Sequence, residues 1–149
     1  MTGFRLGYLI VPKMYVRTIQ ILQQNFFISA NSFVQKAGLA ALQDGPRFIE
    51  HMKMVFDEKR KLMLDGVKKL GFEVAVEPTG AFYIFANAKK FTKNSHKFAL
   101  DLLDKTGVGV TPGIDFGSGG EGFIRFSYAT SLDNIREGLD RIGQYLKTL

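Results

Sequence analysis

The sequence predicts an α+β fold in which helices pack on a small, mostly antiparallel sheet. Two observations favour this class. The chain has 149 residues, of which 46% are apolar, and this is enough for one substantial hydrophobic core. After its first third, the chain shows a long helical pattern, two strand patterns, a helix, two more strand patterns and a final helix. This order of elements is typical of α+β proteins.

The first third of the chain predicts one strand and two helices. Residues 5–11 (RLGYLIV) form a short apolar run that ends at Pro12, as a buried strand does. Residues 13–25 carry apolar side chains at roughly helical spacing, and the same proline suits the first turn of a helix. Residues 29–42 predict a second helix, which the run Asp-Gly-Pro after it ends.

The longest helix is predicted over residues 47–70. Its apolar side chains form one stripe at helical spacing, made of Phe48, Met52, Val55, Phe56, Leu62 and Val67. Lys68 and Lys69 suit the last turn, where positive charge is favourable, and Gly71 suits the position just after it.

Two strands and a helix are predicted next. Residues 72–77 alternate apolar with polar or small side chains, as a half-buried strand does. Residues 81–86 (AFYIFA) are apolar on both faces, which predicts a central strand of the sheet. A helix over residues 95–105 leads to a short strand over residues 107–110.

The last part of the chain predicts a loop, a strand and a helix. Residues 111–122 are rich in glycine, which indicates a functional or flexible loop. Residues 123–128 form the last strand pattern. Thr130 or Ser131 caps a final helix, whose apolar side chains stand three and four residues apart.

The composition excludes several classes of protein. No cysteine is present, which excludes disulfides, thiolate metal sites and cysteine nucleophiles. His51 and His96 have no ligand partner at metal spacing, so no metal site is expected. No apolar run approaches the ~20 residues that span a bilayer, and no secretory signal is recognisable. We expect a cytoplasmic protein with no membrane partner.

The net charge of +6 raises the hypothesis of a nucleic-acid-binding domain. Many basic residues, however, stand four residues from a carboxylate on one predicted helix, as in the pairs Asp57–Lys61 and Asp65–Lys69. The densest basic group suits the exposed start of a helix and comprises Lys89, Lys90, Lys93 and Lys97. We therefore expect no nucleic-acid partner, and such a partner stays a third hypothesis, with affinity that falls steeply as salt rises.

Two arginines are candidates for anion binding. Arg5 ends a glycine-containing turn just before the first predicted strand, and the planar fork of a guanidinium matches phosphate. Spacing alone favours an ordinary surface arginine there. Arg125 stands inside an otherwise apolar strand, where burying its charge without an anionic partner is costly. An edge strand that turns the arginine to solvent is the open alternative.

Three motifs in register give the chain a resemblance to a known family. They are MTGFRLG at residues 1–7, PTGAFY at residues 78–83, and TPGIDFG at residues 111–117 followed by the strand IRFSY. The chain resembles the C-terminal part of class I/II (fold type I) aminotransferases, which are similar to aspartate aminotransferase and depend on pyridoxal 5'-phosphate (PLP). The resemblance implies that residues 1–45 end the large PLP-binding domain and include the linking helix. Residues 46–149 would then be the small C-terminal domain.

The resemblance also implies roles for individual residues. Arg5 would contact the PLP phosphate, and Arg125 would pair with the α-carboxylate of the substrate. Phe116 would line the substrate pocket, although core packing is the alternative in a chain with 14 phenylalanines. In the family, a Ser-x-Ser-Lys run precedes the first motif and its lysine holds PLP as a Schiff base. That lysine would lie upstream of Met1, so this chain would contain no catalytic residue and be inactive alone.

Two functional hypotheses follow from the resemblance. In the first, the chain is a fragment of a homodimeric aminotransferase that moves an amino group between an amino acid and a 2-oxo acid. In the second, it is a stand-alone, non-catalytic binding or assembly domain. The second hypothesis predicts that residues 1–45 are disordered or pair with another copy to cover their apolar faces.

Overall fold

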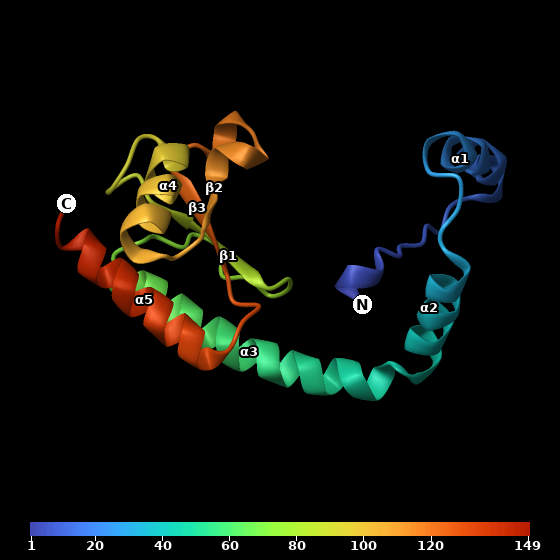
Figure 1. Cartoon of the computed structure of the whole chain (residues 1–149), viewed down its shortest axis with the longest axis horizontal. Helices are drawn as coiled ribbons and strands as arrows, with labels where there is room; N and C mark the ends of the chain where they lie inside the picture. Colours follow the sequence, from blue (N-terminus) through green and yellow to red (C-terminus); the bar gives the residue numbers. More distant parts are fainter. The chain divides into compact units, whose positions relative to one another are not determined.

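The structure is a computed structural model that describes residues 1–149. The chain divides into two compact units, Met1–His51 and Met52–Leu149. Figure 1 shows the elements of both units along the chain. The long helix α3 (Pro46–Lys69) contributes its first residues to the first unit and the remainder to the second.

The first unit contains the short 3₁₀ turn η1 (Thr2–Phe4) and the helices α1 (Lys13–Phe26) and α2 (Ser32–Asp44). Both predicted helices are therefore confirmed. The second begins at residue 32 and not 29, because the side chain of Asn31 accepts a hydrogen bond from the Phe33 N–H and caps it.

The prediction of a strand over residues 5–11 is wrong. The segment is irregular, and its central apolar side chains Tyr8, Leu9 and Ile10 are exposed, Ile10 by 86%. A strand satisfies its backbone N–H and C=O groups through a neighbouring strand. The first unit contains no second strand, so an apolar sequence alone does not produce one here.

The second unit confirms the α+β prediction. Its sheet has three antiparallel strands in the order β1-β3-β2, namely β1 (Tyr83–Asn87), β2 (Thr111–Pro112) and β3 (Phe123–Ser127). Helices α4 (Ser95–Thr106) and α5 (Leu132–Leu146) complete this unit together with most of α3. Ser131 caps α5 by accepting a hydrogen bond from the Asn134 N–H, as the sequence predicts.

One face of the sheet builds the hydrophobic core. The strand residues Ile84, Ala86, Ile124 and Phe126 are buried there with helix side chains such as Val67, Leu102 and Ile135. In Figure 1, α5 runs alongside the C-terminal half of α3. The two helices approach so closely that a Cβ atom on Gly66 would overlap the side chain of Leu139.

Three strand expectations need correction. Residues 72–77 form only a single bridge, between Glu73 and Asn87. Residues 107–110 form no strand, and the pairing begins at Thr111. The central strand is β3, because it pairs with both β1 and β2, whereas the strand predicted at residues 81–86 corresponds to β1, which is buried on one face only.

The glycine-rich segment 111–122 is more regular than a flexible loop. It contains β2 and the 3₁₀ turns η2 (Gly113–Phe116) and η3 (Ser118–Gly120). The exposed i,i+4 ion pairs predicted on α3 are present, with Lys61 Nζ 2.7 Å from Asp57 and Lys69 Nζ 2.6 Å from Asp65. None of the helices is both long enough and apolar enough to span a membrane.

Candidate functional site

The outer face of the sheet carries Arg125 among aromatic side chains. Strand alternation places Arg125 on the side opposite the buried Ile124 and Phe126. In the sheet, Arg125 pairs with Phe85 on β1 and with Thr111 on β2. We call the group Tyr83, Phe85, Phe116, Phe123 and Arg125 the aromatic face.

Two aromatic rings hold the Arg125 guanidinium. Its central carbon lies 5.1 Å from the centre of the Tyr83 ring and 5.0 Å from the centre of the Phe116 ring. A guanidinium over an aromatic face is attracted by the ring quadrupole, by about 0.5–1 kcal/mol at exposed sites and more where water is excluded. Phe116 in turn meets Phe85 edge to face at 5.9 Å. These contacts fix the direction in which the guanidinium points.

The guanidinium has unused hydrogen-bond donors. Its Nη2 donates one hydrogen bond, to Thr111 Oγ1 at 3.1 Å, whereas its Nε is buried and has no partner. None of the ion pairs in the structure includes Arg125. A buried, unsatisfied donor costs about 1–3 kcal/mol, and more where it is charged. The site therefore has the charge, the donors and the fixed orientation that a carboxylate ligand requires.

The loop that carries Phe116 is tied to the start of α4. One carboxylate oxygen of Glu121, Oε1, accepts hydrogen bonds from the Ser95 N–H at 2.6 Å and the Gly122 N–H at 2.8 Å. These backbone hydrogen bonds lower the pKa of Glu121. The fully buried Ser95 also accepts a hydrogen bond through Oγ, from the Ile114 N–H at 3.3 Å.

Six residues of this arrangement were not predicted from the sequence: Tyr83, Phe85, Ser95, Thr111, Glu121 and Phe123. Strand alternation from Phe85 would have placed Tyr83 on the same face. A carboxylate within a glycine-rich segment was the available signal for Glu121. No sequence signal identifies Ser95, because its role depends on which loop packs against α4.

The first unit places Arg5 in a separate pocket. Arg5 is exposed and adopts left-handed backbone angles, φ 51° and ψ 40°, at the end of η1. This conformation costs a residue with a side chain about 1–2 kcal/mol, and such strain clusters at functional sites. The pocket beside it is lined by Met1, Thr2, Arg5, Leu6 and Gly7.

The donor set of this pocket fits a phosphate group. Its polar side chains are a guanidinium and a hydroxyl, and no carboxylate or lysine lines it. Arg5 thus suits the phosphate of PLP, the cofactor that the resemblance implies. Arg5 belongs to the first unit, and Phe116 and Arg125 belong to the second.

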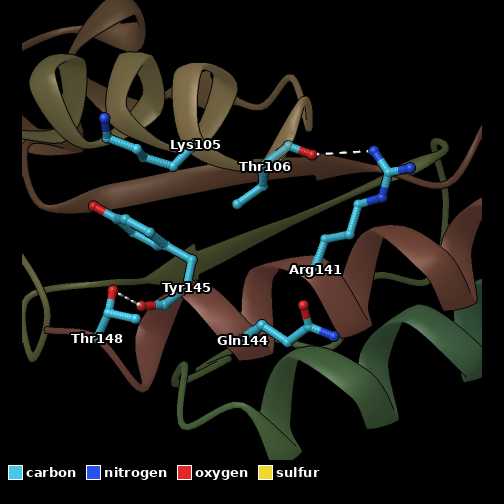
Figure 2. A pocket seen from close by; sticks show the side chains of 6 residues that line it. All are labelled: Lys105, Thr106, Arg141, Gln144, Tyr145 and Thr148. Carbon is cyan, nitrogen blue, oxygen red and sulfur yellow. Dashed lines mark hydrogen bonds between the residues drawn. The ribbon is translucent and has the colours of Figure 1, made fainter.

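A further pocket lies at the ends of α4 and α5. Its lining, drawn in Figure 2, consists of Lys105, Thr106, Arg141, Gln144, Tyr145 and Thr148. Both of its cations are already paired within the chain. Arg141 donates to the Thr106 carbonyl at 3.1 Å and pairs with Glu137, and Lys105 pairs with Asp104 at 3.0 Å. This pocket therefore offers less to an anion than the aromatic face does.

The remaining candidates of the sequence lie on the surface. His51 and His96 are exposed, and no group of three His, Asp or Glu side chains gathers to hold a metal ion. Lys89 and Lys90 lie over the rings of Phe123 and Phe91, at 5.2 and 5.6 Å. Lys93 and Lys97 are exposed, as expected at the start of a helix.

Comparison with known proteins identifies aminotransferases as relatives of this chain. The family model described as aminotransferase class I and II matches residues 1–142. A (5-formylfuran-3-yl)methyl phosphate transaminase from Methanocaldococcus jannaschii is 45% identical over 147 residues, 98% of this chain and 39% of that protein. An aspartate aminotransferase from Pyrococcus horikoshii is 38% identical over 149 residues, 99% of this chain and 38% of that protein.

Solved structures agree with the sequence comparison. The crystal structure of an aromatic aminotransferase from Pyrococcus horikoshii OT3 superposes with a TM-score of 0.90 at 33% identity, over 99% of this chain and 40% of that one. The chain therefore spans about 39% of the length of the relatives that it matches.

Proposed function

The chain belongs to the class I and II aminotransferases, and from this premise we propose that it carries the carboxylate-binding half of an amino-transfer site. The reaction proposed is the transfer of an amino group between an amino acid and a 2-oxo acid. The observation that carries the proposal is the Arg125 guanidinium, which lies 5.1 Å from the centre of the Tyr83 ring and 5.0 Å from that of the Phe116 ring and has a buried, unpartnered Nε. Both substrates of such a reaction have a carboxylate beside the reacting carbon.

Arg125 would bind and orient that carboxylate. Thr111 uses one donor of the guanidinium, and the others stay available for the two carboxylate oxygens. Bidentate pairing fixes direction as well as position. Phe116 and Tyr83 would both cover the guanidinium beside this pair, and Phe116 is the more exposed of the two, at 53% against 37%.

Arg5 would hold the phosphate of PLP. When bound, PLP supplies the electron sink that this chemistry needs, and the protein supplies binding, orientation and electrostatics. The guanidinium and the Thr2 hydroxyl line one pocket, so both can donate to phosphate oxygens. Because no lysine lines that pocket, we expect this chain alone to transfer no amino group.

The domain assignment rests on the same family. We propose that residues 1–45 belong to the cofactor-binding domain and its linking helix, and that residues 46–149 form the small domain. The complete enzyme would be a cytoplasmic homodimer that acts on amino acids and 2-oxo acids.

The test compares two substitutions in the aminotransferase that carries this sequence. Arg125→Ala should raise the substrate KM and lower kcat/KM while PLP stays bound, and Arg5→Ala should release PLP. Loss of one partner of a desolvated charge pair costs about 2–5 kcal/mol, which is well over tenfold in kcat/KM. If Arg125→Ala releases PLP and Arg5→Ala retains it, the two assignments are wrong.

One observation favours the second hypothesis, a non-catalytic assembly domain. Helix α1 has no buried residue, and Met14, Phe26 and Phe27 are exposed by 77%, 72% and 72%. Apolar surface of this kind drives association. Light scattering that shows concentration-dependent self-association, without any carboxylate binding at Arg125, would support this function over amino transfer.

A further inference from the structure

We propose that Glu121 is a positioning residue for Arg125: its carboxylate ties the glycine-rich segment to α4, and this tie keeps the Phe116 ring on the guanidinium. The inference rests on the proposed function of Arg125 and goes beyond it. Glu121 itself makes no contact with Arg125 in the structure, so its effect is transmitted through the segment that carries Phe116.

The tie from Glu121 joins two elements. Ser95 is the first residue of α4, and Gly122 directly precedes β3, the strand that carries Arg125. A single oxygen accepts from both N–H groups, at 2.6 and 2.8 Å. Charge-assisted hydrogen bonds of this kind are about twice as strong as neutral ones. The carboxylate therefore fixes the end of the segment relative to α4.

A second tie fixes the start of the segment. Ser95 Oγ accepts from the Ile114 N–H, and Ile114 lies in η2 two residues before Phe116. Ser95 is fully buried, so this acceptor does not exchange for water. The backbone N–H and the hydroxyl of one serine thus anchor both ends of the segment, one of them through Glu121.

Buried apolar side chains contribute little to the position of the segment. Its two apolar side chains, Ile114 and Phe116, are exposed by 36% and 53%. Gly119 has no neighbouring atom within 4 Å of where a Cβ would stand. The pairing of β2 with β3 and the contact between Gly113 and Gly120 hold the backbone of the segment, and the two ties fix it against α4.

The test uses the whole chain, with arginine side chains labelled for NMR. The Arg125 Nε–H resonance reports on the rings beside it, and Phe116→Leu defines the resonance without the Phe116 ring. The probe ligand is 3-phenylpropanoate, a monocarboxylate without an amino group. Glu121→Ala should move the resonance toward its Phe116→Leu position and weaken 3-phenylpropanoate binding several-fold.

Matched variants separate positioning from general loss of structure. Glu121→Gln keeps an acceptor oxygen, so its Arg125 Nε–H resonance and its 3-phenylpropanoate affinity should match those of the wild type. Asn94→Ala removes the Asn94 cap of the same helix, which bonds the Lys97 N–H and not the segment, and should change neither readout. If Glu121→Ala fails to fold, Ser95→Ala removes the hydroxyl that bonds the Ile114 N–H and interacts with Glu121, and it should move the resonance in the same direction.

Two results would overturn the inference. One is an unchanged Arg125 resonance in Glu121→Ala, or in Ser95→Ala if that variant replaces it. The other is an equal change in Asn94→Ala. Failure of the proposed function looks different, since wild-type chain would then bind no 3-phenylpropanoate while the resonance still moved in Glu121→Ala.

Discussion

Gly113 and Gly120 touch across the turn that carries Phe116, so closely that a Cβ atom on either would overlap the backbone of the other. The two residues begin η2 and end η3. Their contact folds the segment back on itself ahead of β3. Glycine at these two positions is therefore a packing requirement.

Gly113→Ala should destabilise the second unit. The new methyl group would press on the carbonyl oxygens of Gly120 and Phe123, and overpacking of this kind costs about 1–3 kcal/mol. Gly119→Ala is the matched control, because open space surrounds that position, and it should change stability by less than about 0.5 kcal/mol. Urea unfolding of both variants measures the difference, and equal stability would contradict the packing argument.

Gly66→Ala should loosen the contact between α3 and α5. Alanine is favoured over glycine within a helix by about 1 kcal/mol, but here its methyl group would overlap the buried Leu139 side chain. We expect net destabilisation. Gly138→Ala, whose nearest neighbour is Val108 at 3.9 Å, should instead stabilise the protein by about 0.5–1 kcal/mol. Thermal unfolding distinguishes the two, and a stabilising Gly66→Ala would refute this account of the helix contact.

Stability should fall in acid partly through Glu121. Backbone hydrogen bonds lower its pKa in the folded chain from an ordinary value of 4.5. A carboxyl group with a lowered folded pKa contributes stability that is present above its unfolded pKa and is lost as pH falls through the folded pKa. Asp57 and Glu77 also have lowered pKa values. They are present in Glu121→Gln as well, so a comparison with this variant isolates the contribution of Glu121.

The measurement for this prediction is the free energy of unfolding against pH, from 7 downward, for wild type and Glu121→Gln. The difference in the free energy of unfolding between the two proteins should be largest at neutral pH and should shrink as the pH falls below 4.5. A difference that stays constant across the range would mean that the ionised carboxylate contributes nothing to the tie.

PLP should form no specific covalent bond with this chain. A specific adduct requires a lysine beside the phosphate site, and none lines the Arg5 pocket. After addition of PLP and borohydride, mass spectrometry should show only scattered, substoichiometric labelling of exposed lysines. One full equivalent of adduct at a single lysine would show that the cofactor site has been assigned wrongly.

Local patterns in the sequence predicted the helices well, because a capping residue and an apolar stripe are contained within each helix. Ser131 and the stripe of α5 are the clearest case. Strands depend on partners elsewhere in the chain, which explains why residues 5–11 form none. The aromatic residues of β1 misled the sequence analysis for a related reason. Tyr83 and Phe85 lie beside Arg125 on the outer face of the sheet, so their apolar side chains do not indicate a strand that is buried on both faces.

The site was predictable only in part. The resemblance pointed to Arg5, Phe116 and Arg125, and the structure brings Phe116 onto Arg125. It could not point to Thr111 or Glu121, since hydrogen bonds between residues 14 and 26 positions apart depend on the fold. The roles of the three predicted residues stay predictions until they are measured.

Carboxylate binding at Arg125 tests the central claim most directly. The Arg125 Nε–H resonance should shift saturably when 3-phenylpropanoate is added to wild-type chain, and Arg125→Gln should abolish binding. Arg136→Gln, which removes an exposed arginine paired with Asp133, should bind as wild type does. A wild-type resonance that does not respond to 3-phenylpropanoate, or binding that survives in Arg125→Gln, would contradict the account.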